Sequence, residues 1–296
     1  MKKIIFLLSS ICYSQLGFTG AMADISDIHD WNGFYVGGNI GGLWSNPNLN
    51  VLSENIFTYT PTPTFRIPSS NAIQILADTA AQSATGSFPL NGSGVIGGAQ
   101  FGVNMEFNNL WVFGLETDLQ GLNSSNNSIF TQSAATGDTR NSNVDTVFNL
   151  YQKTNYLGTL RGRLGISIPQ MDSLLVYVTG GLAYGEVQAS TTINGEEIPY
   201  QGVTRFSASN TASATQAGYT LGAGFEKYIS SLWSVKVEYL YYNLGTLNYD
   251  NGELVATSGI VQIPQTIPII SYVNSSLSSI QFSGSMVRAG INYKFA

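Results

Sequence analysis

The feature that most constrains the fold of this sequence is a two-residue alternation of bulky apolar side chains with small or polar ones. A clear case is VRAGINYKFA at 287–296, where valine, isoleucine and two aromatics share one parity and arginine and lysine share the other. A period of two is the pattern of a β-strand with two different faces. Segments of this kind are long enough to cross a bilayer as tilted strands, which takes about 9 to 11 residues. They span residues 32–44, 94–107, 110–122, 154–168, 174–188, 216–228, 232–244 and 282–295.

The connections between these eight segments alternate between short and long. The short connections are 108–109, 169–173 and 230–231, and the long ones are 45–93, 123–153, 189–215 and 245–281. Short turns at one end and long polar loops at the other are typical of an even-numbered up-and-down barrel with both termini on the short-turn side. A soluble β-sandwich gives no reason to separate loop lengths in this way. We therefore predict an all-β fold, an eight-stranded antiparallel transmembrane β-barrel with four long extracellular loops and three short periplasmic turns.

The first residues have the pattern of a signal peptide. Lys2 and Lys3 precede an apolar run, and Ala21-Met22-Ala23 offers a cleavage site of small residues, which predicts cleavage after Ala23. The predicted organisation is a signal peptide at 1–23, a periplasmic segment at 24–31 and the barrel at 32–296. Removing the signal peptide removes the only cysteine and leaves 10 of the 12 Lys and Arg against 18 Asp and Glu. An acidic chain of this kind is a poor candidate for binding nucleic acid.

The two faces of each segment differ in size as well as polarity. In the third segment Trp111, Phe113 and Leu115 oppose Glu116 and Asp118. The interior of an eight-stranded barrel is narrow and is filled by side chains, so it suits the face with small and polar residues. We therefore expect the bulky apolar face to contact lipid and the charges to point into the lumen.

Aromatic residues lie near the ends of the segments, which predicts a girdle at the membrane interfaces. Most of them belong to the rim of the short turns, and Trp44 belongs to the opposite rim. The predicted girdle comprises Trp31, Trp44, Trp111, Trp233, Tyr293 and Phe295.

The inward charges of neighbouring segments are expected to meet near the middle of the barrel. Charges that are removed from bulk water need partners, so we predict an ion-pair network that crosses the lumen. Its role is either to fill the lumen or to gate a narrow channel. The members of the predicted network are Glu116, Asp118, Arg161, Arg163, Lys236, Glu238 and Arg288.

The sequence disfavours an enzyme. His29 is the only histidine and precedes the first segment, so a Ser-His-Asp arrangement at the outer rim is excluded. Without a second histidine or a cysteine in the processed chain, a metal site is not expected either, and we predict no cofactor.

Two stretches within the long loops are predicted to have structure of their own. The first, 69–84, predicts a short helix with Ile73, Leu76 and Ala77 on one face. The apolar stretch at 260–270 predicts structure within its loop, or else an extended strand, a cover over the mouth or a partner surface.

Motifs along the whole chain resemble a known family. They are WNGFYVGGNIGG at 31–42, GVIGGAQFGVN at 94–104, FGLETDLQG at 113–121, LGTLRGRLG at 157–165, VYVTGGLAYG at 176–185 and VEYLYYNLG at 237–245. These resemble the small outer-membrane β-barrel family, the porin-like and opacity-like surface proteins of Gram-negative bacteria. VRAGINYKF resembles the closing strand of the family, whose final aromatic is read by the barrel assembly machinery. Here Ala296 follows that aromatic, whereas the family usually ends on it.

The resemblance implies a location in the cell outer membrane with extracellular loops and periplasmic termini. The expected function is a structural or surface-interaction role in which the long loops mediate recognition or adhesion. The alternative is a narrow porin-like channel gated by the ion pairs. The expected partners are outer-membrane lipid and lipopolysaccharide, the assembly machinery, and a host or extracellular ligand of the loops.

Overall fold

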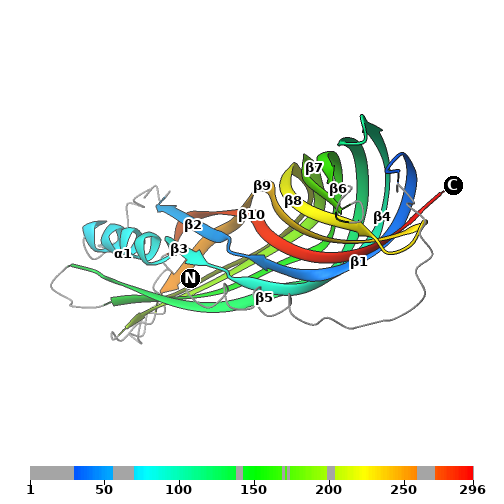
Figure 1. Ribbon diagram of the computed structural model, residues 1–296. Coiled ribbons are helices and arrows are strands. Elements are labelled where there is room, and N and C mark those ends of the chain that lie inside the picture. Colours follow the sequence, from blue (N-terminus) through cyan, green and yellow to red (C-terminus); the bar gives the residue numbers. More distant parts are fainter. Residues whose placement is uncertain are drawn as a thin grey trace.

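The computed structural model describes residues 30–55, 70–137, 143–168, 171, 174–198, 204–258 and 271–295. Within these ranges the chain is a long antiparallel β-structure with a helix at one end (Figure 1). Its elements are β1 (Gly33–Ser45), β2 (Asn48–Asn55), α1 (Ser70–Ser83), β3 (Gly86–Pro89), β4 (Gly92–Phe107), β5 (Trp111–Ala135), β6 (Asn143–Ile168), β7 (Leu174–Ile198), β8 (Thr204–Tyr228), β9 (Trp233–Ser258) and β10 (Ser271–Lys294). The predicted cleavage site at Ala23, His29 and the apolar stretch at 260–270 lie outside the described residues.

Eight of the strands close into a ring, in the order β1-β4-β5-β6-β7-β8-β9-β10, because β10 pairs with β1. Tyr35 lies opposite Lys294 at one end of that closing ladder, and Ser45 lies opposite Gly284 at the other. All neighbouring strands are antiparallel. The predicted eight-stranded up-and-down barrel is therefore confirmed, and its closing strand is the one with which the sequence ends.

Tight turns lie at the rim where the barrel begins and ends. Asn108 and Asn109 join β4 to β5 with φ of 54° and 48°, the left-handed conformation that both central residues of a type I′ hairpin require and that asparagine tolerates. At the same rim the amide of Phe295 donates to the carbonyl of Phe34, and that of Lys294 donates to the carbonyl of Leu232. We call this end the turn rim.

The opposite end of the molecule corrects the prediction of four long loops. Strands β5 to β10 run for 24 to 26 residues each, so they continue well into the ranges expected as loops. The range 45–93 contains β2, α1 and β3 rather than a loop alone. Elements β2, α1 and β3 and the far ends of β5 to β10 form a distinct part of the molecule, which we call the extension. It begins at the level of the bulges described in the next paragraph. Figure 1 shows it projecting from the barrel.

Irregular pairing marks the passage from the barrel to the extension. The register shifts between Gly121 and Ser124 on β5, and between Thr154 and Tyr156 on β6. On β9, Gly245 has φ of +83°, and its ladder with β10 shifts nearby. Bulges of this kind bend a strand and increase its twist, so they turn the long strands out of the ring.

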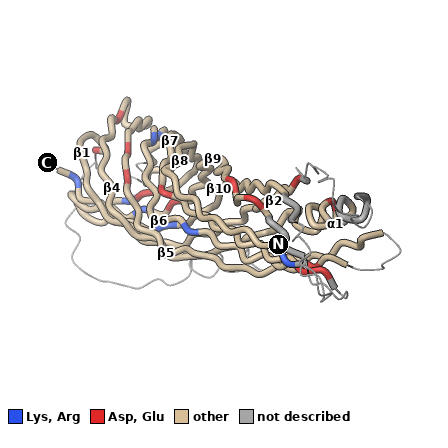
Figure 2. The backbone as a smooth tube through the Cα atoms, turned by 180° about the vertical axis from the view of Figure 1, so that it is seen from behind, with Lys and Arg blue, Asp and Glu red and all other residues tan. Residues whose placement is uncertain are grey.

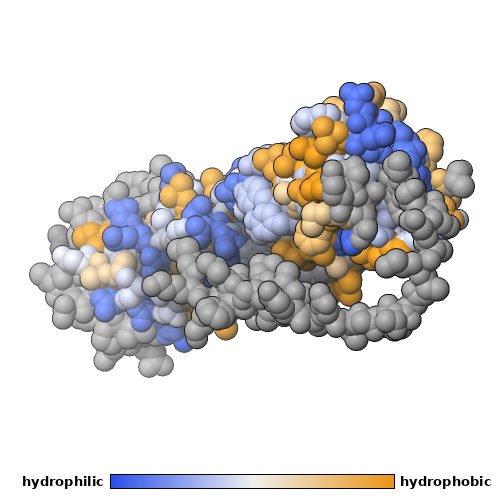
Figure 3. Space-filling view, in the orientation of Figure 1, coloured by the Kyte–Doolittle hydropathy of each residue, from blue (hydrophilic) through white to orange (hydrophobic). Residues whose placement is uncertain are grey.

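The outward face changes from apolar to polar at the same level. On β7 the side chains of Val176, Val178, Leu182 and Tyr184 are 39% to 62% exposed, while the outward positions from Glu186 to Glu196 are polar. Figure 3 shows the corresponding hydrophobic area over the barrel. We call this outward surface the apolar belt. Among the described residues, no helix has the length and hydropathy needed to cross a membrane.

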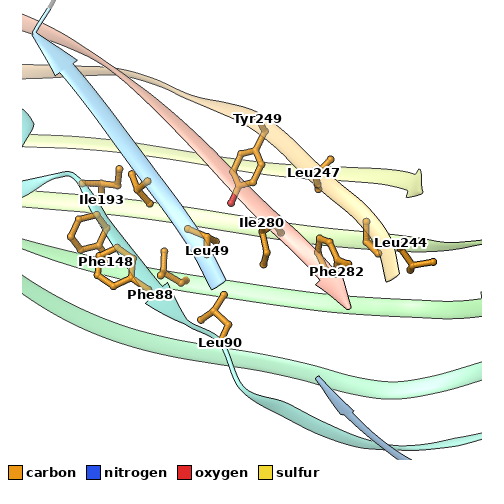
Figure 4. Packing of buried hydrophobic residues seen from close by; sticks show 14 of the residues in the cluster. Leu49, Phe88, Leu90, Phe148, Ile193, Leu244, Leu247, Tyr249, Ile280 and Phe282 are labelled. Carbon is orange, nitrogen blue, oxygen red and sulfur yellow. The ribbon is translucent and has the colours of Figure 1, made fainter. Parts of the chain in front are cut away.

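The extension has a hydrophobic core of its own, which lies on the inward face of its strands (Figure 4). Phe88 on β3 packs against Phe148 on β6 with ring centroids 4.5 Å apart, and Leu49 and Leu150 are fully buried beside them. This inversion, apolar inside and polar outside, is typical of a water-exposed β-structure. It explains why the bulky outward residues that mark the predicted membrane strands are few here.

Helix α1 covers this core, and its bounds confirm the helix predicted at 69–84. Ala77 and Ala80 are buried, as is Ala84 directly after the helix, which sets one face of α1 against the strands. The side chains of Ile73 and Leu76, the other residues of the predicted face, lie outside the described set.

The interior of the extension also holds a tyrosine of β9. Burial raises the pKa of the Tyr249 phenol, whose oxygen is 2.6 Å from the Thr191 hydroxyl.

Candidate functional site

The candidate site is a layer of charged side chains inside the barrel, brought together from five strands by the two-residue alternation. Figure 2 shows acidic and basic positions of several strands at one level of the barrel. The ladder sets Glu116 of β5 opposite Arg161 of β6, and Glu238 of β9 opposite Arg288 of β10. All seven residues of the predicted network are at most 4% exposed. Together with Glu226 of β8 we call them the lumen cluster.

Arg161 links opposite walls of the barrel. From β6 its Nη1 is 2.8 Å from Glu238 Oε1 on β9, and its Nη2 is 2.8 Å from Asp118 Oδ2 and also bonds to Glu116 Oε1. Its Nε donates to the Thr159 hydroxyl at 2.9 Å. A single guanidinium therefore donates to three carboxylates and a hydroxyl. These contacts connect β5 and β6 directly to β9 across the lumen.

Arg288 and Lys236 complete the central part of the lumen cluster. Arg288 Nη2 is 2.7 Å from both Asp118 Oδ2 and Glu238 Oε2. Lys236 Nζ donates to both carboxylate oxygens of Glu116 at 2.8 Å. Each of these carboxylates is shared by more than one cation, so the pairs form a single network.

Toward the turn rim the lumen cluster continues through residues that the sequence reasoning missed. Arg163 Nη2 is 2.6 Å from Glu226 Oε2, and the guanidinium lies 3.9 Å from the ring centroid of Tyr177. Its Nη1 donates to the Tyr35 hydroxyl at 2.7 Å. Glu226 has the inward parity of β8, so the alternation could have found it. Tyr35 and Tyr177 also have the inward parity of their strands, but the alternation alone does not indicate that their rings pack against a buried guanidinium.

The lumen cluster is electrically balanced. Among the described residues it holds four cations, Arg161, Arg163, Lys236 and Arg288, against four anions, Glu116, Asp118, Glu226 and Glu238. Buried charges are tolerated when they are paired and hydrogen-bonded. The balance therefore lets eight ionised groups occupy a space from which bulk water is excluded.

Small inward residues make room for these long side chains. Gly41 of β1 lies opposite Arg288, and a Cβ added there would lie 2.7 Å from Arg288 Cα and 2.2 Å from the Val287 carbonyl oxygen. Gly181 of β7 lies opposite Arg161, with Leu160 O only 2.1 Å from such a Cβ. Glycine is thus the residue that fits beside the arginines.

Beyond the lumen cluster, toward the extension, the interior becomes apolar. Leu43, Ile96, Leu157, Leu240 and Met286 are at most 1% exposed and continue into the core of the extension. A cavity of about 10 Å³, lined in part by serine and threonine side chains, lies near this level and has room for about one water. The charged layer is therefore followed by an apolar plug.

The turn-rim end of the lumen is occupied by Trp31, which corrects its assignment to the girdle. Its side chain is 2% exposed, its Nε1 donates to the Ser167 hydroxyl at 3.2 Å, and its ring lies 4.4 Å from that of Tyr228. The physical reason is parity, since Trp31 shares the inward parity of Tyr35 and Leu43.

The other aromatics of the predicted girdle lie on the outer surface. Trp44 is 50% exposed, Trp111 and Trp233 are each 42% exposed, and Phe295 is 48% exposed. Tyr293 is half-buried because its ring packs 5.1 Å from that of Trp233 and 5.6 Å from that of Phe295. Within the described ranges, no group of three His, Cys, Asp or Glu side chains is placed to hold a metal.

The sequence is similar to those of known proteins. Residues 16–260 match the family described as outer membrane protein beta-barrel domain. The 31 kDa outer-membrane immunogenic protein of Brucella melitensis biotype 1 is 30% identical over 273 residues, which cover 91% of this chain and 85% of that protein. The 22 kDa outer membrane protein of Rhizobium leguminosarum bv. viciae is 32% identical over 98 residues, which cover 33% of this chain and 37% of that protein. Among solved structures, the outer membrane protein OprG from Pseudomonas aeruginosa aligns with a TM-score of 0.34 and 12% identity, covering 90% of this chain and 98% of that one.

Proposed function

The chain belongs to the outer-membrane β-barrel family, and from this premise we propose that it is a closed barrel that carries the extension as a surface for recognition or adhesion. The filled lumen is the observation that supports this function most strongly. The lumen cluster joins opposite walls, and the apolar plug follows it. A barrel sealed twice is suited to hold a structure at the surface rather than to pass solutes.

The proposed orientation places the turn rim in the periplasm and the extension outside the cell. Outer-membrane barrels have short periplasmic turns and longer extracellular connections, which supports this direction. The polar outer face of the extension also suits water, because the apolar belt ends where the extension begins.

Labelling of intact cells tests this orientation, because the processed chain is expected to have no cysteine of its own. Ile129→Cys places a thiol on the outer face of the extension, where the native side chain is 66% exposed. Ser230→Cys places one at the exposed β8–β9 turn. A membrane-impermeant maleimide should label the first variant and not the second until the cells are broken. The reverse pattern would overturn the orientation.

Partners follow from the same proposal. The apolar belt would contact outer-membrane lipid, with lipopolysaccharide beyond it, and the strand ending at Phe295 would be read by the assembly machinery. The extension would bind an extracellular or host ligand. A catalytic role and a nucleic-acid partner are not proposed, because the buried carboxylates are engaged by cations and the chain is acidic.

A narrow channel gated by the lumen cluster is the second candidate. It is favoured by buried polar atoms that have no hydrogen-bond partner in the described structure, among them Asp118 Oδ1, Arg288 Nη1 and both amide atoms of Gln120. Such atoms are suited to bind water within the charged layer. Conductance in planar bilayers separates the two candidates, because only the channel passes current.

A further inference from the structure

The outer face of the extension carries one exposed pair of leucines among polar residues. Leu52 of β2 and Leu277 of β10 lie directly opposite each other in the ladder and are 49% and 52% exposed. Side chains opposite each other in an antiparallel pair have Cβ atoms about 5 Å apart, so the two form one apolar surface. Figure 1 shows β2 beside β10 at this end of the molecule.

This pair is separate from the apolar belt. The outward positions of β10 between Leu277 and Val287 are serine and glutamine, which include Gln281. Ten residues of strand correspond to about 33 Å along its axis. The leucines therefore lie beyond the part of the surface that can contact the hydrocarbon of the membrane, and lipid burial does not explain them.

Three carboxylates surround the leucines on the same face. Ser275 of β10 pairs with Glu54 on one side and with Glu253 of β9 on the other, and Leu277 itself pairs with Asp250. Since neighbouring strands lie about 4.8 Å apart, Glu54 and Glu253 are about 10 Å from each other across β10. All three acids are exposed, and among the described residues none of them forms an ion pair.

The inner side of these strands holds the face rigidly. The Ser53 hydroxyl donates to the carbonyl of Ala84 at 3.0 Å, and its oxygen lies within hydrogen-bond distance of Ser276 Oγ, also at 3.0 Å. Asn274 Nδ2 donates to the carbonyl of Ala77 in α1 at 3.1 Å. The sheet is thus fixed to the helix behind it, and a partner would meet a surface that is already ordered, which lowers the entropy cost of binding.

Resting on the proposed function of the extension, we propose that this face, the leucine patch formed by Leu52, Leu277, Glu54, Asp250 and Glu253, binds a cationic amphipathic segment of another polypeptide. An aliphatic side chain of that segment covers the two leucines, and lysine or arginine on either side meets the carboxylates. Charge complementarity selects this partner. A second copy of the chain would set like charges against each other, and an anionic lipid surface would be repelled for the same reason.

Binding of labelled synthetic peptides to the purified barrel in a non-ionic detergent tests the proposal. The probe is an alternating lysine–leucine heptapeptide, compared with a glutamate–leucine peptide and a lysine–serine peptide of the same length. Fluorescence anisotropy should show binding of the first alone. We expect Leu52→Asn with Leu277→Asn to weaken it about tenfold, the equivalent of about 1.4 kcal/mol. Glu54→Gln with Glu253→Gln should weaken it most at low salt, where exposed charges are least screened.

Matched variants elsewhere on the outer face serve as controls. Ile129→Asn removes an exposed apolar side chain from β5, and Glu186→Gln removes an acid from β7. Both should leave the affinity unchanged. The proposal is overturned if these variants weaken binding as much as the patch variants, if the glutamate–leucine peptide binds equally well, or if the leucine variants abolish a dimer seen by light scattering instead. Heat-modifiable gel mobility shows that each variant is folded, and conductance of the same preparation reports on the closed barrel independently.

Discussion

Arg161 is the side chain on which the lumen cluster depends most, since it contacts three carboxylates on two walls of the barrel. Arg161→Leu would leave those carboxylates with too few cations in a space without bulk water. Removing one partner of a buried ion pair destabilises a protein by about 3 to 5 kcal/mol. We predict a loss of this size in the free energy of unfolding, measured by urea titration in detergent micelles.

A surface pair supplies the control for that prediction. Arg205 and Glu196 are 3.4 Å apart, with side chains that are 72% and 43% exposed. Exposed pairs contribute about 0 to 1 kcal/mol, so Arg205→Leu should change the unfolding free energy by less than about 1 kcal/mol. Equal losses in the two variants would show that the lumen cluster is not buried as described.

The tryptophans differ in their surroundings, which makes a second residue-level prediction. A variant that keeps only Trp31 should show fluorescence protected from brominated lipid, because this side chain lies inside the barrel. A variant that keeps only Trp111 should be quenched, because its ring is on the outer surface near the turn rim. Strong quenching of the Trp31 fluorescence would show that its side chain contacts lipid, as first predicted.

At the scale of elements, the ladder between β1 and β10 closes the ring through close contacts at glycine. Gly41→Ala would place a Cβ 2.2 Å from the Val287 carbonyl oxygen, so the strands would have to move apart. Overpacking of this kind costs about 1 to 3 kcal/mol. We predict lower urea resistance and slower conversion to the heat-modifiable folded form.

Gly97→Ala is the matched change on the neighbouring strand β4. Its added Cβ would point outward, with the Asn39 carbonyl oxygen at 3.6 Å as its nearest contact. That is an ordinary distance, and the unfolded chain loses freedom, so we expect stability unchanged or raised by up to about 1 kcal/mol. If both variants were equally unstable, tight packing inside the ring would not be the reason.

The elements also show what the sequence could predict. The alternation identified all eight strands of the ring because their outward residues are bulky and apolar. The alternation did not identify the strands of the extension, because their outward positions are mostly serine, threonine and asparagine, as on β8. These residues are also common in loops. The alternation placed the seven charges in the lumen but could not assign all their partners, since the tilt of the strands decides which residues meet across the barrel.

The extension supplies a further prediction at this scale. If residues 124–135 and 143–153 are strand rather than loop, their amides should exchange slowly with deuterated solvent, because they pair along a ladder from Ser124–Thr154 to Ala135–Asn143. Hydrogen exchange read by mass spectrometry should show protection comparable to that of the membrane part of β5. If the amides of these residues exchanged as fast as in an unfolded chain, the residues would be loops, as the sequence predicted.

At the scale of the whole molecule, three layers follow one another along the barrel axis: Trp31 at the turn rim, the lumen cluster at mid-height, and the apolar plug that merges into the core of the extension. Buried side chains fill the interior in each layer, and the long strands connect all three. The molecule is thus a barrel whose strands continue into a folded extension.

The most direct test of this account is the conductance of the purified, folded chain in planar lipid bilayers. The account predicts no stable current steps for the unaltered chain across a range of voltages. Stable, reproducible steps from the folded barrel would contradict it and would show that the lumen cluster and the plug leave a continuous water path.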